Sequence, residues 1–169
     1  MSKYNYIRYL AYFIEILIFY VLEQTPYLLD GIFGVKPLII ISSALSIAML
    51  EKRNISIIFS IFTGFLMDMS LGGYFGFNTI IVLILCYLIN ILSTDLIKTN
   101  LLTSSIVNIV CITIVFTLQF LFLYVFKGYE DQMYAFMNHY LPLIVVSFLV
   151  SPLMYLLNKL FFICFRERE

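Results

Sequence analysis

Two carboxylates lie within or at the end of apolar stretches of this sequence and are its first candidates for chemistry. Glu15 is about halfway along the first stretch, and Asp68 closes the third. An ionisable side chain at membrane depth is costly and marks a functional candidate. For Glu15 two interpretations are open: contact with a partner helix or ligand, or a carboxyl that is protonated or satisfied inside its own helix bundle. Arg8, seven residues earlier, lies close to the same helical face, which predicts that the two side chains lean together.

Glycines accompany the second carboxylate. Gly64 and Asp68 are four residues apart and therefore share one face of a helix. A glycine there lets a neighbouring backbone approach closely, and Asp68 can then hydrogen-bond the start of the next helix. Gly72 follows at a tight turn, with Gly76 four residues later. The pattern predicts a compact helical hairpin, and a ligand contact is the alternative.

Signatures of catalysis, metal binding and nucleic-acid binding are missing from the sequence. It contains no Walker motif, no G-x-S-x-G and no H-E-x-x-H. His139 is the single histidine, and Cys86, Cys111 and Cys164 share no metal-ligand spacing. The formal net charge is zero. We therefore expect no enzymatic activity, no cofactor, no metal site and no nucleic-acid partner.

The elements that must position these groups are apolar helices. Of 169 residues, 63% are hydrophobic and 12% charged, against roughly 45–50% and 25% in ordinary globular domains. One soluble core of this size cannot bury so much apolar surface. The sequence predicts an all-α integral membrane bundle, a single transmembrane domain over residues 1–169. Its six spans are expected at about residues 6–22, 37–50, 54–67, 74–92, 101–126 and 141–164.

The charges decide between two topologies. The second and third stretches are shorter than the roughly 20 residues that cross a bilayer core, so a re-entrant hairpin is the alternative to six crossings. With six crossings and both termini in the cytoplasm, 8 of the 10 Lys and Arg residues lie inside and 2 outside. A hairpin entering from outside would strand Lys52 and Arg53 in the membrane. Six crossings are therefore favoured.

A family resemblance rests on short motifs spread over nearly the whole chain. Pro26 follows the first span, Gly64-Phe-x-x-Asp68 closes the third, and Gly72-x-x-x-Gly76 leads into the fourth. With a length near 170 residues and this number of spans, the sequence resembles the MreD family, the small membrane subunit of the bacterial rod-shape (elongation) complex. A second glycine that the family often shows before the Asp is missing here.

The resemblance implies a multi-pass protein of the bacterial cytoplasmic membrane that acts as a non-enzymatic scaffold. The implied partners are an MreC-like membrane protein and, directly or indirectly, MreB-like filaments and peptidoglycan synthases. The candidates for partner contacts and helix packing are Glu15, Pro26, Gly64, Asp68, Gly72 and Gly76.

The family also looks distantly related to substrate-binding subunits of energy-coupling-factor vitamin transporters, which supplies the alternative function. In such a subunit Asp68, His139 and Tyr140 would be candidate vitamin contacts at the outer span ends. The first stretch, however, offers Ala11 as its one small residue and lacks the small-xxx-small spacing that would dock a coupling protein. The scaffold is therefore preferred. An intramembrane enzyme ranks last, because Glu15 and Asp68 fall on different predicted helices.

Overall fold

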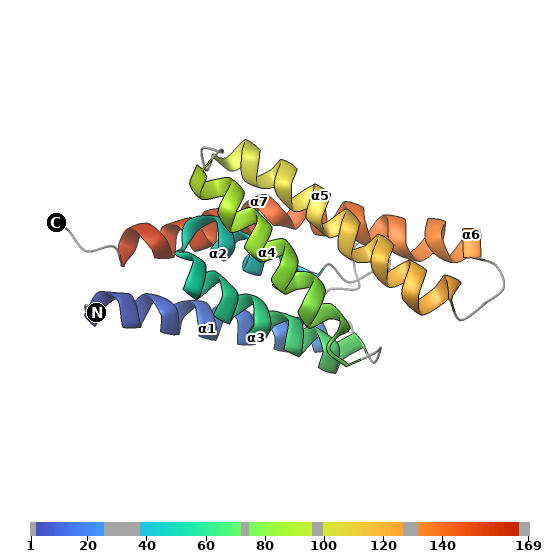
Figure 1. The fold of residues 1–169 in the computed structure, drawn as a ribbon, viewed down its shortest axis with the longest axis horizontal. Helices are drawn as coiled ribbons and strands as arrows, with labels where there is room; N and C mark the ends of the chain where they lie inside the picture. The colour runs from blue at the N-terminus through green and yellow to red at the C-terminus, as the bar shows by residue number, and fades with distance from the viewer. Residues whose placement is uncertain (1–2, 26–37, 72–74, 96–99, 127–131, 166–169) are drawn as a thin grey trace.

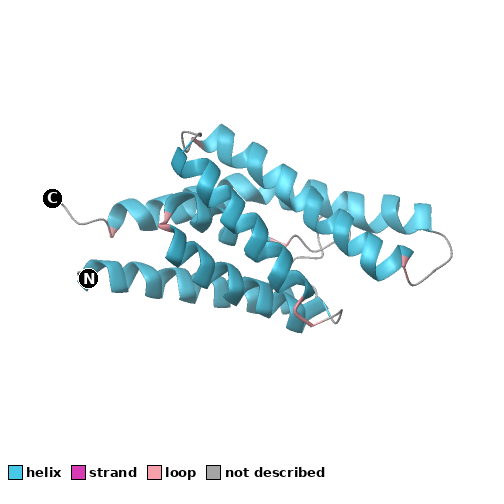
Figure 2. Ribbon diagram, in the orientation of Figure 1, coloured by secondary structure: helices cyan, strands magenta, loops and turns pink. Residues whose placement is uncertain are grey.

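Every regular element in the described part of the chain is helical (Figure 2). The computed structural model describes residues 3–25, 38–71, 75–95, 100–126 and 132–165, so Pro26 and Gly72 lie outside the described residues. The predicted all-α class is confirmed for these ranges. The elements are α1 (Lys3–Gln24), α2 (Ile39–Leu50), α3 (Arg53–Leu71), α4 (Phe77–Asp95), α5 (Leu101–Phe120), the π-helical η1 (Leu121–Val125), α6 (Gln132–Ala135), the π-helical η2 (Phe136–Tyr140) and α7 (Leu141–Cys164).

The long helices run roughly along one axis of the molecule (Figure 1). The start of α1 and the end of α7 lie at the same end of the bundle, where both chain ends are marked. At the opposite end, α5 with η1 and the α6–η2–α7 segment reach farthest. Apolar side chains such as Leu10, Ile80 and Leu102 remain largely exposed along the outer faces. Such a surface suits a bilayer as solvent.

The short helix α2 occupies the centre of the bundle. It has 12 residues, and 11 of them, from Ile39 to Met49, are buried. It contacts α1, α3, α4, α5 and α7. A helix that is apolar all round is buried on every side, and at about 1.5 Å per residue it is about 18 Å long. It is therefore too short to cross a core of about 30 Å unaided.

Six crossings were predicted, and four helical stretches are long and apolar enough to span a membrane on their own. Within the described ranges these are Asn5–Gln24, Phe77–Thr94, Leu101–Phe120 and Phe136–Cys164. Helices α2 and α3 form a helical hairpin whose tip is at residues 51–52. α2 is its buried arm, while α3 keeps an apolar face exposed at Ile58 and Met69.

Helix ends differ from the predicted span ends by a few residues. α3 continues to Leu71, beyond the predicted end near residue 67, and α4 continues to Asp95. Hydropathy locates apolar stretches, whereas backbone hydrogen bonding sets where a helix ends. Asp68 lies in the last turn of α3, at the end of the helix where it was predicted.

Candidate functional site

Asp68 holds the start of α4. One carboxylate oxygen, Oδ1, accepts a hydrogen bond from the backbone N–H of Asn78 at 2.9 Å. The other, Oδ2, accepts from the N–H groups of Gly76 and Thr79, at 2.9 and 3.2 Å, and from the Thr79 hydroxyl at 2.6 Å. The first N–H groups of a helix have no partner within it, and a carboxylate there also favours the helix dipole. The predicted contact between Asp68 and the following helix is confirmed.

The two described glycines of this hairpin serve different purposes. A Cβ atom built on Gly64 would lie 2.4 Å from the Cα of Thr79, so only glycine allows α3 and α4 to pack this closely. The predicted close approach at Gly64 is therefore confirmed. Gly76 has open space around it but a φ of +92°, a backbone conformation that favours glycine. One glycine is required by space and the other by backbone conformation.

Glu15 joins three helices inside the bundle. Its Oε1 accepts hydrogen bonds from the Ser43 hydroxyl of α2 at 3.0 Å and from the Asn158 amide of α7 at 3.2 Å. The side chain is 6% exposed. Its other oxygen, Oε2, has no hydrogen-bond partner among the described residues. Neither Ser43 nor Asn158 was singled out from the sequence, where both are isolated polar residues in apolar stretches.

Arg8 does not pair with Glu15, and that prediction is wrong. Arg8 instead forms a buried ion pair with Glu51, with 2.7 Å between Nε and Oε1. The Tyr12 hydroxyl donates to the same Glu51 oxygen at 3.2 Å. Seven residues separate the two α1 side chains by about 10 Å along the helix, whereas the hairpin tip brings Glu51 beside Arg8. The sequence showed Glu51 only as part of a polar break.

The environment of Glu51 is both buried and charged. Burial raises the pKa of its carboxyl above the ordinary value, and the positive charge of Arg8 opposes that rise. The Arg8 guanidinium also lies 5.0 Å from the ring centre of Phe162 and 5.4 Å from that of Tyr9. These contacts tie the start of α1, the α2–α3 tip and the end of α7 together.

The N-terminal end of α2 is capped by side chains of other helices. Glu23 of α1 accepts a hydrogen bond from the N–H of Ile40 at 2.9 Å. Ser147 of α7 accepts one from the N–H of Leu38 at 3.1 Å. Because this end of α2 is buried, protein groups must satisfy these donors. Sequence reasoning missed Glu23 because it stands in the polar break after the first apolar stretch.

The C-terminal end of α2 is held in the same way. The Asn90 amide of α4 donates to the carbonyl oxygens of Ala48 and Glu51, at 2.8 Å each. Asn90 is buried. The last carbonyl groups of a helix have no partner within it, and Asn90 supplies one from a neighbour. The central helix is thus fixed at both ends by polar side chains from α1, α4 and α7.

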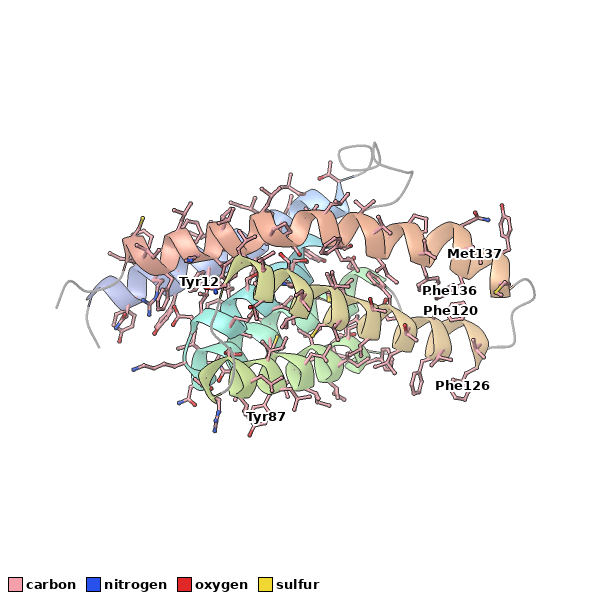
Figure 3. All side chains as sticks on the ribbon, turned by 90° about the horizontal axis from the view of Figure 1, so that it is seen from above. Tyr12, Tyr87, Phe120, Phe126, Phe136 and Met137 are labelled. Carbon is pink, nitrogen blue, oxygen red and sulfur yellow. The ribbon has the colours of Figure 1, made fainter. Side chains whose placement is uncertain are left out.

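Polar and aromatic contacts join the remaining helices. The Gln119 amide of α5 donates to the side-chain oxygen of Asn78 at 2.6 Å. Figure 3 shows Phe120 and Phe136 facing each other between α5 and η2, with ring centres 5.2 Å apart. Tyr140 packs on the same Phe120 ring at 5.2 Å. The His139 side chain lies outside what the structure describes.

The carboxylates of this site mainly join helices to one another. Within the described ranges, no three His, Cys, Asp or Glu residues gather closely enough to hold a metal ion. Asp68, Glu51 and Glu23 each bond to a neighbouring helix or its connection. Glu15 keeps one oxygen unused.

Fold and site together define a multi-helix membrane protein whose buried polar groups join its own helices. Residues 4–165 match the family model of rod shape-determining protein MreD, and the chain therefore belongs to the MreD family. The resemblance found in the sequence is confirmed. No curated protein and no solved structure matches the chain.

Proposed function

We propose that the protein is a non-enzymatic scaffold of the bacterial rod-shape (elongation) complex in the cytoplasmic membrane. In this role it binds an MreC-like membrane protein and links, directly or indirectly, MreB-like filaments to peptidoglycan synthases. The observation that carries the proposal is the family match over residues 4–165.

The use of the buried polar groups supports a structural role. Buried ionisable residues of a membrane protein are functional candidates. Here Asp68 accepts hydrogen bonds from the start of α4, and Glu23 accepts one from the start of α2. Glu51 forms an ion pair with Arg8 and accepts a hydrogen bond from Tyr12. Carboxylates that join helices are consistent with a rigid protein that presents fixed surfaces to its partners.

Six crossings with both termini in the cytoplasm are part of the proposal. The start of α1 and the end of α7 lie at the same end of the bundle in Figure 1, which suits an even number of crossings. Lys52 is exposed at the α2–α3 tip, beside the ion pair with the start of α1, which suits a cytoplasmic position. In a Cys164→Ser background, Lys52→Cys should react with an impermeant maleimide only after the cells are opened. Reaction in intact cells would contradict this topology.

The partner test is affinity purification of the tagged protein from its native membranes after mild crosslinking, with mass spectrometry of what is recovered. We expect an MreC-like protein together with cell-wall synthases. The matched control is an unrelated polytopic protein carrying the same tag. Depletion of the protein should also turn rod-shaped cells round. Unchanged shape and no shape proteins among the partners would overturn the scaffold.

The vitamin-transport alternative has less support. Asp68 would be a contact of the vitamin, yet both its oxygens accept hydrogen bonds from α4. Tyr140, another such contact, packs against Phe120. Recovery of paired ATPases and a coupling protein in the same purification would nevertheless establish this alternative in place of the scaffold.

A further inference from the structure

A groove of about 420 Å³ lies between α1 and α7 on the side of Glu15. We call it the α1–α7 groove. Besides Glu15, its lining consists of apolar side chains: Ala11, Ile14, Ile18 and Phe19 from α1, with Leu157 and Phe161 from α7. Ile14 is 46% and Ile18 51% exposed, so the groove reaches the outer surface of the bundle.

Glu15, the polar residue of this lining, has one oxygen without a hydrogen-bond partner among the described residues. Oε1 of Glu15 accepts from Ser43 and Asn158, while Oε2 is buried without a partner among the described residues. Buried polar atoms are nearly always hydrogen-bonded, and leaving a carboxylate oxygen unpaired in apolar surroundings is expensive. An occupant of the groove that brings a hydrogen-bonding side chain to this depth would satisfy that oxygen.

The depth of Glu15 selects the kind of occupant. It lies 12 residues after Lys3 and 9 before Gln24, the two ends of α1. At 1.5 Å per residue it is about 18 Å from one end and about 14 Å from the other, which is the middle of a core of about 30 Å. Lipid headgroup donors stay at the interface, and acyl chains carry no donor. A helix can bring an apolar surface and a donor to this depth together.

We propose that the α1–α7 groove receives a membrane-spanning helix of a partner protein, which presents a hydroxyl, amide or basic side chain to Glu15 Oε2. The inference rests on the proposed scaffold function and names the surface that would serve it. Polar side chains are the groups that hydrogen-bond across helices in membranes, and apolar side chains around them supply the packing.

The test places a photo-crosslinking phenylalanine derivative at Ile18, inside the groove, or at Ile106 on α5 as the matched control. Ile106 is 61% exposed and lies outside the groove. In native membranes, we expect the derivative at position 18 to crosslink a membrane-spanning peptide of a partner from the shape complex. Mass spectrometry should find a polar or basic residue in that peptide. The derivative at position 106 should not crosslink it.

Two variants measure the groove's contribution to binding. Ile18→Trp fills the groove and Glu15→Leu removes the acceptor, and each should lower partner recovery about tenfold, whereas Ile106→Trp should leave it unchanged. Because Glu15 also bonds to Ser43 and Asn158, Glu15→Leu counts only if its gel-filtration profile is that of the unchanged protein. Ile18→Trp touches neither hydrogen bond and carries the test if Glu15→Leu fails to fold.

The outcomes separate the two proposals. If shape proteins are recovered but position 18 crosslinks only lipid or a second copy of this chain, the groove inference is overturned and the scaffold stands. Partner recovery that is unchanged by Ile18→Trp has the same meaning. If the unchanged protein recovers no shape protein at all, the scaffold proposal fails and the groove inference fails with it.

Discussion

Replacing Asp68 by alanine should destabilise the α3–α4 hairpin more than any exposed substitution on the same helix. The carboxylate accepts four hydrogen bonds from the start of α4. Of the three backbone donors, the N–H of Asn78 belongs to a residue that is only 2% exposed, while Gly76 and Thr79 are partly exposed. Water can therefore replace the carboxylate at two of these donors but not at Asn78.

The magnitude follows from this difference. A buried donor left unpaired costs about 1–3 kcal/mol, and loss of a helix cap costs about 1 kcal/mol more. Asp68→Ala should thus lower the free energy of unfolding by about 2–4 kcal/mol. For a chain of this length that corresponds to a fall in Tm of about 5–15 °C. Asp68→Asn keeps one acceptor oxygen, so its fall should be about half as large.

The assay is thermal unfolding in mild detergent, followed by the fraction that stays monodisperse on gel filtration. Asn54→Ala is the control, because Asn54 is exposed on the same helix. A double variant with Thr79→Val should lose less than the sum of the two single losses, since the two side chains share a hydrogen bond. A Tm for Asp68→Ala within about 2 °C of the unchanged protein, together with additive losses, would refute the reasoning.

Three further predictions concern the other contacts between helices. Gly64→Ala should lower stability by about 1–3 kcal/mol, because the new methyl group meets the backbone of α4. Arg8→Met should lower it by about 3–5 kcal/mol, because it leaves Glu51 buried without its cation; adding Glu51→Gln to that variant should recover at least half of the loss. Glu23→Ala should lower it by about 1–2 kcal/mol, because the N-terminal end of α2 loses a cap.

The same unfolding assay checks these three. Met69→Ala is the control for Gly64→Ala, since Met69 is exposed on the same helix. If the two variants unfold at the same temperature, α3 and α4 do not pack as described. A double Arg8 and Glu51 variant no more stable than Arg8→Met would contradict the ion-pair argument. For Glu23→Ala, an unchanged Tm would show that α2 begins without its help.

The central position of α2 explains why this membrane protein holds so many buried polar groups. A 12-residue helix has eight terminal backbone groups without partners inside it. Away from water, each needs a donor or acceptor from the protein. Glu23, Ser147 and Asn90 supply several of them. The polar side chains of α1, α4 and α7 thus follow from burying a short helix.

The periodic and local features of this protein could be predicted from its sequence. The apolar stretches determined the helical membrane class, because one soluble core of this size cannot bury so many apolar residues. The spacing of Gly64 and Asp68 determined the tight α3–α4 hairpin, because four residues bring two side chains to one helix face. The short motifs also determined the family.

Contacts between distant segments were decided by the tertiary structure alone. The pairing of Arg8 with Glu51 spans 43 residues, and that of Glu15 with Asn158 spans 143. Helical spacing favoured Glu15 as the partner of Arg8, but the α2–α3 hairpin placed a closer carboxylate beside it. Hydropathy predicted α2 as a membrane-crossing helix like the others, whereas the packing of the other helices encloses it at the centre of the bundle. Periodicity describes one helix at a time, and the choice of partner depends on which helices the fold brings together.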